Sequence, residues 1–370
     1  MAYIAGSARI TTLLSDCIEG YRLTEGEAAL LLRAEGPDVL AVAAAADRVR
    51  EERVGETVTW VRNQNINVTN VCINRCGFCG FSRRPGDPDA FRLSHDAVVR
   101  KAREAAGRRV TEICTVSGLA PDFDGDAYCA ILRACREGAP GVHLHASNPM
   151  EVAYGAERSG RTTEEQLLLM REAGLGSLCG TAAEILVDEV RARICPGKCS
   201  SAEWARIIIE AHRLGIPTTA TIMYGSGETV GDRARHLAIL REIQDETGGF
   251  TEFVPLSFIH HQTPLYRAGR APPGATGRED LLMIAVARLF FDNIDHIQAS
   301  WVKLGVKMAG LMLLAGADDL GGTMFEERIS AGAGATGTDY LAPEEMARIA
   351  ADLGRPFAQR TTLYERVNPA

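Results

Sequence analysis

The chain has 370 residues, of which 46% are hydrophobic and 24% are charged. This composition excludes disordered, collagenous and fibrous proteins and leaves enough apolar sequence for a sizeable core. Forty Lys and Arg residues stand against 48 Asp and Glu residues, which gives a net charge of −8. Without a basic excess, no nucleic acid and no membrane surface is expected as a partner, and a small-molecule ligand is the better hypothesis.

The N-terminal segment predicts helices and no export signal. Thr24 and the acidic residues after it resemble a helix start, and residues 39–53 repeat apolar residues at helical spacing. No basic region with an apolar core and a cleavage site opens the chain, and no apolar run reaches 18 residues. Because ten cysteines are also too sparse for a disulfide scaffold, we expect a reducing, cytoplasmic compartment.

Short β-rich runs then alternate with longer helix-like stretches. The expected strands are 67–72, 112–117, 142–147, 176–180, 217–224, 252–258, 296–301 and 318–321. The expected helices between them are 94–107, 126–137, 163–173, 200–214, 230–246, 278–291 and 302–314. This alternation predicts an α/β fold, a (β/α)₈ TIM-type barrel with helical N- and C-terminal extensions. We expect an extension over 1–57, the barrel over 58–325, and a second extension over 326–370 that packs on the barrel.

Three cysteines, Cys72, Cys76 and Cys79, stand at CxxxCxxC spacing directly after the first expected strand. Thiolates at such spacing select iron-sulfur clusters or zinc. A closed zinc site needs a fourth ligand, and neither Cys nor His recurs before His95. A [4Fe-4S] cluster held by three cysteines would leave one iron open to a substrate or cofactor. Zinc with a remote ligand remains the alternative.

The cysteine spacing, with Phe78 before the last cysteine, resembles the radical S-adenosylmethionine superfamily. Further segments resemble one branch, the 5-amino-6-ribitylaminouracil:tyrosine 4-hydroxyphenyl transferase component of FO synthase: 65–72, 143–146, 180–186, 248–256, 296–305 and 319–324. That resemblance covers roughly 58–361. The menaquinone-pathway enzymes, dehypoxanthine futalosine cyclase and aminofutalosine synthase, share much of this pattern, and residues 197–201 and 291–293 are more similar to the cyclase.

The resemblance implies a [4Fe-4S] cluster, S-adenosyl-L-methionine bound at its open iron, and an external one-electron reductant that triggers radical formation. The implied substrates are tyrosine and 5-amino-6-ribitylaminouracil, or a futalosine-type nucleoside if the menaquinone alternative holds. A second CxxxCxxC is absent, so a second radical enzyme would complete the deazaflavin chromophore. A non-catalytic iron-sulfur or zinc protein is the third hypothesis.

The resemblance and the ends of the expected strands together select the candidate site residues. We expect the cofactors to meet Phe78, Ser117, Gly118, Ser147, Glu184 and Arg191, and we expect catalytic roles for His260, His145 and Tyr224. The guanidinium of Arg191 suits the methionine carboxylate, whereas a surface ion pair is the alternative for both Glu184 and Arg191. His143 and His145 share one strand face, either toward the barrel lumen or as hydrogen-bonded core histidines. The pKa of an unperturbed His260 would suit proton transfer.

Two positions depart from the family pattern on the expected catalytic face. Ser117 stands within Val-Ser-Gly where Gln-Gly-Gly is expected, and Ser226 stands where a histidine is expected. Further along, strand alternation predicts that Gln298 and Ser300 face one way while Trp301 packs the other way. Among the remaining cysteines, Cys195 and Cys199 are interpreted as free thiols, with a second cluster as the alternative, and Cys114 and Cys179 are interpreted as small buried residues.

Overall fold

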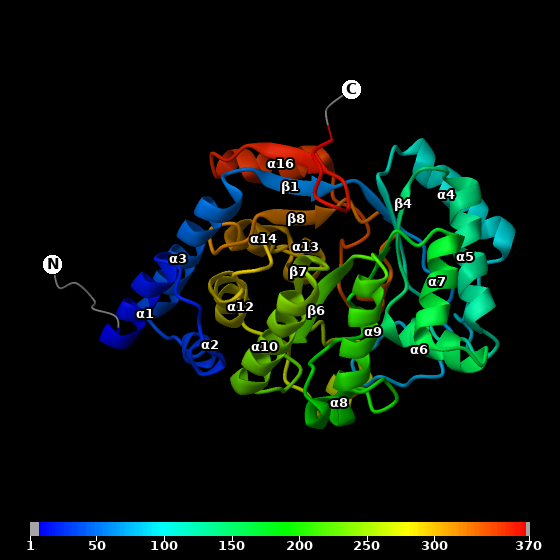
Figure 1. Ribbon diagram of the computed structural model, residues 1–370, viewed down its shortest axis with the longest axis horizontal. Coiled ribbons are helices and arrows are strands. Elements are labelled where there is room, and N and C mark those ends of the chain that lie inside the picture. The colour runs from blue at the N-terminus through cyan, green and yellow to red at the C-terminus, as the bar shows by residue number, and fades with distance from the viewer. Residues whose placement is uncertain (1–6, 368–370) are drawn as a thin grey trace.

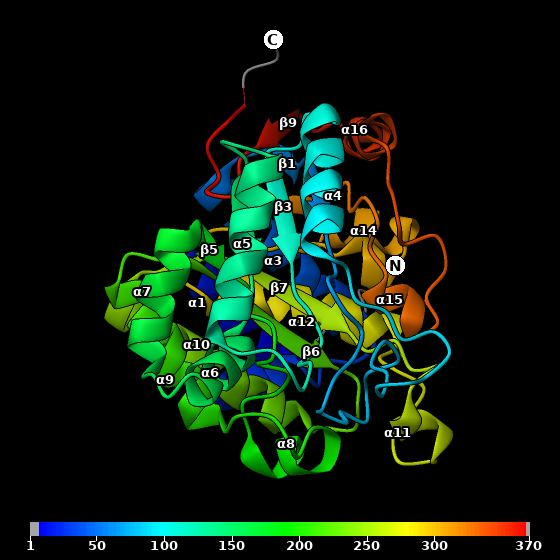
Figure 2. The ribbon, with the colours of Figure 1, turned by 90° about the vertical axis from the view of Figure 1, so that its right-hand side faces the viewer.

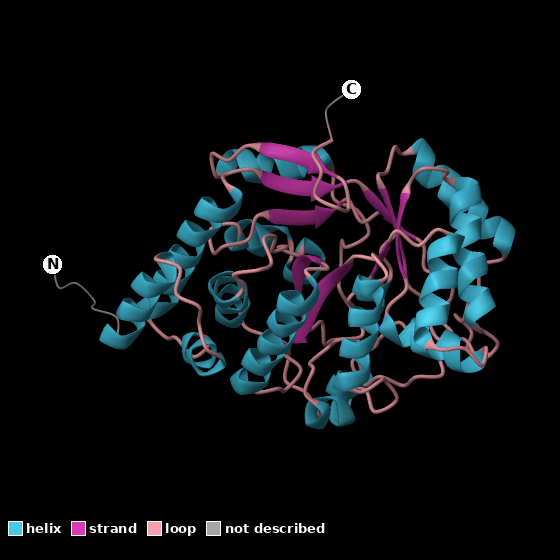
Figure 3. Cartoon of the chain, viewed as in Figure 1, coloured by secondary structure: helices cyan, strands magenta, loops and turns pink. Residues whose placement is uncertain are grey.

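Parallel strands form the sheets of the computed structural model, which describes residues 7–367. The strands are β1 (Val58–Val61), β2 (Asn63–Asn65), β3 (Glu112–Thr115), β4 (His143–Ala146), β5 (Ser177–Leu178), β6 (Thr218–Tyr224), β7 (Phe250–Ser257), β8 (Asp319–Gly322) and β9 (Phe357–Arg360). They form a six-stranded sheet in the order β2-β3-β4-β5-β6-β7 and a three-stranded sheet in the order β8-β1-β9. Figure 3 shows both sheets among the surrounding helices.

The two sheets join into one ring. Only Arg62 separates β1 from β2, so the chain passes directly from one sheet to the other. On the far side, isolated parallel bridges pair Phe253 with Ile297 and Gln298 with Asp319, which connects β7 to β8. The ring therefore has eight strand positions, counting β1 and β2 as one, and the expected α/β (β/α)₈ barrel is confirmed.

Helices surround the ring and extend it at both ends (Figure 1). They are α1 (Ala8–Ile18), α2 (Glu25–Leu31), α3 (Pro37–Val54), α4 (His95–Gly107), α5 (Gly125–Gly138), α6 (Pro149–Arg158), α7 (Thr163–Ala173), α8 (Asp188–Ile194), α9 (Ser201–Arg213), α10 (Val230–Thr247), α11 (Pro264–Arg267), α12 (Gly277–Phe290), α13 (Trp301–Leu304), α14 (Val306–Met312), α15 (Ile329–Gly332) and α16 (Pro343–Asp352). Within residues 7–367, no helix is long and apolar enough to cross a membrane.

The first three helices pack on the outside of the barrel. Thr24 and Glu27 form a reciprocal capping box that begins α2, as the sequence predicts. The α2 helix packs against α10, and α3 packs against α12 and α1. In the turned view of Figure 2, α4 and α5 lie side by side on the opposite flank, where they are also in contact.

Two expected strands are wrong. Residues 67–72 run as irregular chain because the side chains of Asn67 and Asn70 donate to the carbonyls of Val116 (3.1 Å) and Asp89 (2.9 Å), a pairing that competes with a strand ladder. The strand expected at 296–301 is reduced to the two bridges described above, because α13 already begins at Trp301.

Further along, the expected helix 302–314 is divided at Gly305, whose φ of 76° ends one helix and precedes the next. The division into 1–57, 58–325 and 326–370 stays a prediction. The last of these segments supplies β9, which pairs with β1 at the bottom of the ring, where the strands begin.

Candidate active site

A cavity of about 390 Å³ lies inside the barrel. Side chains from alternate positions of the strands line it, among them Glu112 and Cys114 of β3, Thr219 and Thr221 of β6, and Glu252 and Val254 of β7. This alternation is the two-residue period of a strand, which directs every second side chain into a barrel. The parity of each strand residue therefore decides whether it can reach a ligand in the cavity.

The three-cysteine loop lies at the carboxyl ends of the strands, and Cys72, Cys76 and Cys79 all line the cavity. Backbone hydrogen bonds fix this loop to distant parts of the chain. The amide of Ile73 donates to the carbonyl of Leu119 (2.9 Å), and the amide of Gly77 donates to the carbonyl of Ile194 (2.7 Å). The fold thus holds all three thiols at one end of the cavity.

These thiols fit the three-cysteine cluster that the spacing implies. Within residues 7–367, no three His, Cys, Asp or Glu side chains come close enough to hold a single metal ion. Cysteines that each bind a different iron of a cluster stand farther apart than the ligands of one ion, so this spacing does not conflict with a cluster. Burial raises the pKa of the Cys76 thiol, and the ammonium of Lys198 acts against that rise.

Beside the thiols lies a buried ion pair between Lys198 and Glu184, and both residues line the cavity. The Lys198 ammonium also stands 5.2 Å from the centre of the Phe78 ring. Burial acts to lower the pKa of Lys198, but Glu184 and Cys76 outweigh it and the pKa is raised. Phe78 and Glu184 thus reach the cavity as the sequence predicts, whereas Lys198 was missed because nothing marks a lone lysine between two unassigned cysteines.

Ser117 and Gly118 also line the cavity, but their amides are already engaged. The Ser117 amide donates to the Glu151 carboxylate (3.1 Å), and the Gly118 amide donates to the carbonyl of Thr69 (2.9 Å). A Cβ at Gly118 would lie 2.3 Å from the carbonyl oxygen of Val71, so only glycine allows this close approach. Gly118 thus holds the chain that leads into the cysteine loop, while Ser117 is anchored to α6.

Glu151 is a buried carboxyl group of α6 that the sequence does not mark. Burial raises its pKa to about 8, and its Oε2 has no hydrogen-bond partner within the described chain. The group lines the cavity next to Ser117. It therefore keeps one buried carboxyl oxygen unpaired beside Ser117.

Arg191 and Ser147 do not reach the cavity. The guanidinium of Arg191 is buried and donates to the carbonyls of Cys199 (2.6 Å) and Ala182 (3.2 Å), so backbone oxygens occupy the fork expected for a carboxylate. Ser147 is buried with a φ of 56°, because the chain leaves β4 in a left-handed turn before the side chain can continue the strand alternation.

Tyr224 and His260 also lie outside this cavity. Tyr224 is fully buried, and its hydroxyl donates to Asp280 of α12 (2.7 Å). It has the opposite strand parity to Thr219 and Thr221, so it faces the helix layer. His260 lines a second, neighbouring cavity of about 410 Å³ and stacks on His261 with ring centres 3.9 Å apart. Burial and His261 lower the pKa of His260.

His145 does line the cavity, at the bottom of the barrel, as the lumen alternative of the sequence predicts. The Ser177 hydroxyl lies 2.8 Å from Nδ1 of His145 and 2.8 Å from Nε2 of His143, which fixes both rings. Burial lowers the pKa of His145 to about 4, so the imidazole is neutral at pH 7. Glu112, on the neighbouring strand, accepts a hydrogen bond from Asn63 (3.1 Å).

Opposite His145, Glu252 and Arg360 complete the bottom of the cavity. The Oε2 atom of Glu252 accepts from Tyr364 (2.7 Å), Arg360 (3.2 Å) and Gln298 (3.3 Å). Arg360 also forms a two-pronged pair with Asp319, with distances of 2.5 and 3.0 Å. We call the cavity-lining residues Asn63, Glu112, His145, Glu252, Gln298 and Arg360 the floor.

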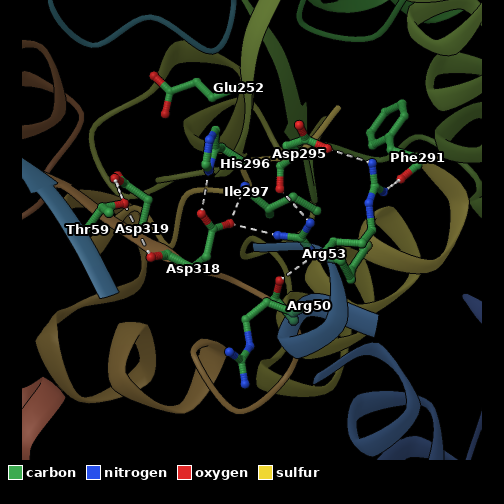
Figure 4. Close-up of polar contacts among 12 residues, drawn as sticks. Arg50, Arg53, Thr59, Glu252, Phe291, Asp295, His296, Ile297, Asp318 and Asp319 are labelled. Carbon is green, nitrogen blue, oxygen red and sulfur yellow. Dashed lines mark hydrogen bonds and ion pairs between the residues drawn. The ribbon is translucent and has the colours of Figure 1, made fainter. Parts of the chain in front are cut away.

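A second layer of polar contacts lies behind the floor. Figure 4 shows Thr59 directed at Asp319 and His296 directed at Asp318, with distances of 2.6 and 2.7 Å. The ring of Tyr364 stacks between His296 and Arg360, and the His296 and Tyr364 ring centres are 3.5 Å apart. Strand parity at residues 252, 254 and 256 is a signal that could have found Glu252. No such signal marks Arg360 and Tyr364, because both residues belong to the C-terminal extension.

The remaining expectations divide between the cavity and the helix layer. Gln298 and Ser300 line the cavity while the indole of Trp301 donates to the carbonyl of Gly322 (2.9 Å), so the expected alternation is confirmed. Ser226 is buried and bonds to Glu228, so this departure from the family pattern lies away from the cavity. Cys114 and Cys179 line the cavity wall.

Comparison with known proteins assigns the two halves of the barrel separately. The Radical SAM superfamily pattern matches residues 66–240, and the pattern of the CofH/MqnC C-terminal region matches residues 247–365. A structure of methylornithine synthase shares the fold, with a TM-score of 0.71, 20% identity, and coverage of 94% of this chain and 97% of that one.

Curated relatives narrow the family further. The FO synthase of Nocardia farcinica is 46% identical over 94% of this chain and 40% of its own length. The 5-amino-6-(D-ribitylamino)uracil–L-tyrosine 4-hydroxyphenyl transferase of Methanoculleus marisnigri is 67% identical over 95% of this chain and 96% of its own. Given the cysteine loop and this likeness along almost its whole length, the chain belongs to the 5-amino-6-(D-ribitylamino)uracil–L-tyrosine 4-hydroxyphenyl transferase family of the radical SAM superfamily.

Proposed function

We propose that this protein is a radical S-adenosylmethionine transferase that cleaves the side chain of tyrosine and adds the 4-hydroxybenzyl group to 5-amino-6-(D-ribitylamino)uracil. The observation that carries the proposal is the identity of 67% to the transferase of Methanoculleus marisnigri along almost the whole chain. The cavity supports it, because the three thiols open onto an interior space rather than onto the surface.

Cys72, Cys76 and Cys79 would hold a [4Fe-4S] cluster, with S-adenosylmethionine beside it. When bound, this pair supplies a carbon-centred radical that can take a hydrogen atom from tyrosine. Phe78, Glu184 and Lys198 line the cavity next to the thiols and would contact the S-adenosylmethionine. Gly118 would position the cysteine loop through its bond to Thr69, and the Ser117 amide is held by Glu151 of α6.

The barrel wall contributes by enclosing the reactants. The apolar side chains of Met223, Val254 and Leu256 line the cavity. A benzyl radical needs such a shielded space, and it also needs the uracil ring held within bonding distance. One cavity lined by both the thiols and the floor meets both requirements.

The reaction also needs partners outside this chain. We propose an external one-electron reductant, a second radical enzyme that completes the chromophore, and a cytoplasmic setting in which the cysteines outside the cluster stay reduced. Purified protein with a chemical reductant removes the need for the natural electron donor in the test below.

The test is an anaerobic incubation of the iron-loaded protein with dithionite, S-adenosylmethionine, tyrosine and 5-amino-6-(D-ribitylamino)uracil. We expect 5′-deoxyadenosine together with a hydroxybenzyl adduct of the uracil, both measured by mass spectrometry. Tyrosine labelled with ¹³C at Cβ should transfer the label to the adduct. Turnover without tyrosine, or turnover of a futalosine-type nucleoside in its place, would overturn the proposal.

A further inference from the structure

The floor of the cavity combines buried polar groups with unused hydrogen-bonding atoms. Glu112, Glu252, Gln298 and Arg360 are each more than nine-tenths buried, yet all four line the cavity. Every hydrogen bond that Glu252 accepts within the described chain goes to Oε2, which leaves Oε1 free. His145 is bonded through Nδ1 and keeps Nε2 free. Because both residues line the cavity, these two atoms are available to a ligand bound there.

The charges of the floor select the kind of ligand. Three carboxyl groups, those of Glu112, Glu252 and Asp319, surround a single guanidinium, that of Arg360. Arg360 is already engaged by Asp319 and Glu252, so it offers little to a carboxylate ligand. An amino acid carboxylate would therefore be repelled. Neutral hydroxyl groups, in contrast, can donate to carboxylate oxygens and to an imidazole nitrogen.

The floor lies at the opposite end of the cavity from the cysteine loop. Glu112 and Val116 of the same strand region both line the cavity, four residues apart, which corresponds to about 13 Å along a strand. The two lysines that line the cavity, Lys198 and Lys303, bond to Glu184 and Ser330. Lys303 comes five residues after Gln298 in the chain. It therefore lies toward the carboxyl ends of the strands, the end of the cavity that also holds the cysteine loop.

We propose that the floor is a binding site for a polyol chain, and that it holds the ribityl hydroxyls of the uracil substrate while the ring points toward the cysteine loop. This inference rests on the proposed function. Glu112, His145 and Glu252 determine specificity in it, and none of them takes part in forming the radical. The class of ligand is a neutral, sugar-derived chain attached to a heterocycle.

The experiment compares two substrates in three proteins. The substrates are 5-amino-6-(D-ribitylamino)uracil and 5,6-diaminouracil, which lacks the ribityl chain. The proteins are the natural chain, Glu112→Gln and Glu252→Gln. Glu344→Gln is the matched control, because Glu344 is exposed on α16. Each is assayed for adduct formation and, separately, for 5′-deoxyadenosine.

We expect Glu112→Gln and Glu252→Gln to lower kcat/KM for the ribityl substrate roughly ten- to a hundredfold, the usual effect of losing a charged hydrogen bond. Their kcat/KM for 5,6-diaminouracil should match that of the natural chain within about twofold, because the missing chain makes no contact to lose. The Glu344→Gln control should behave like the natural chain with both substrates.

The outcomes separate this inference from the proposed function. If the natural chain forms no hydroxybenzyl adduct with the ribityl substrate, the proposed function fails. If it forms the adduct but uses 5,6-diaminouracil equally well, the polyol site is overturned. Equal losses with both substrates in the variants would also overturn it, because they would indicate a structural role. Glu112→Gln keeps the test decisive if Glu252→Gln does not fold, since Glu112 accepts one hydrogen bond from Asn63.

Discussion

The two ends of the cavity are built in different ways. At the upper end, the cysteine loop is irregular chain whose position depends on backbone hydrogen bonds and on the close contact of Gly118 with Val71. At the floor, side chains from regular strands bond to one another, and Arg360 enters from the C-terminal extension. At the upper end, the thiols thus lie on a loop that backbone contacts hold in place. At the floor, the buried charges lie on regular strands.

This difference follows the division between the two matched regions in part. The cysteine loop lies within the region shared across the radical SAM superfamily, residues 66–240. Glu252, Gln298, Arg360 and Tyr364 lie within the more specialised C-terminal region, residues 247–365. Glu112 and His145 of the floor also lie within residues 66–240, so the two ends of the cavity are separated in space and only partly in the sequence. Changes at one end should therefore leave the chemistry of the other end largely intact.

Replacing Cys76 by Ala should have the largest effect on activity. Two thiols cannot hold the cluster that three hold, so 5′-deoxyadenosine formation should fall to background and the iron content should drop. The free energy of unfolding without iron should change little beyond the loss of a small buried group. Iron analysis measures the loss of the cluster, and product quantification measures the loss of 5′-deoxyadenosine formation. Retained S-adenosylmethionine cleavage in Cys76→Ala would contradict the assignment of the upper end.

Replacing Arg360 by Met should have the largest effect on stability. The carboxylates of Asp319 and Glu252 would stay buried without their partner, and removing one member of a buried ion pair costs about 3–5 kcal/mol. Urea denaturation measures the loss. Arg348→Met is the control, because Arg348 is exposed and pairs only loosely with Glu345, at 3.7 Å. Equal stability of the two variants would show that the floor does not depend on its charge pairs.

Replacing Gly118 by Ala should affect the upper end alone. The new Cβ would lie 2.3 Å from the Val71 carbonyl oxygen, so the chain leading to Cys72 must shift, at a cost of about 1–3 kcal/mol. Iron binding should weaken as well. Gly26→Ala in α2 is the control, since nothing lies within 4 Å of its Cβ position and alanine favours a helix. Unchanged iron affinity in Gly118→Ala would argue against the positioning role.

The floor should also show a modest pH dependence of stability through His145. Burial lowers its folded pKa to about 4, below an unfolded value of about 6.5. The unfolded chain therefore binds the proton more readily, and stability is present above pH 6.5 and lost as the pH falls toward 4. At pH 5 the loss is at most about 2 kcal/mol. Unfolding at pH 7 and pH 5 in the natural chain and in His145→Gln isolates this contribution, and an equal pH dependence in both would contradict it.

The sequence was sufficient for the barrel because hydrophobic alternation and helix starts repeat regularly along it. It was also sufficient for the thiols, since CxxxCxxC carries its chemistry in its spacing. It misplaced the first strand, because the asparagines at 67 and 70 prefer backbone carbonyls to a ladder. Tyr224 was selected without regard to strand parity, which the neighbouring Thr221 and Met223 would have corrected.

The sequence predicted His145 and Gln298 of the floor, but the charge pairs of the floor lay beyond prediction for a different reason. Its charged members lie far apart in the sequence, and Arg360 meets Glu252 only because β9 joins the sheet beside β1. No local pattern marks such a pair. The same holds for Lys198 and Glu184, which are brought together by two loops beside the cysteines.

The most direct test of this division is the number of hydroxybenzyl adducts formed per 5′-deoxyadenosine in Glu112→Gln, measured with saturating S-adenosylmethionine and a limiting concentration of the ribityl substrate. We expect 5′-deoxyadenosine to continue to form while the ratio of adduct to 5′-deoxyadenosine falls well below that of the natural chain. An unchanged ratio, or equal loss of both products, would show that the floor and the radical end do not act separately.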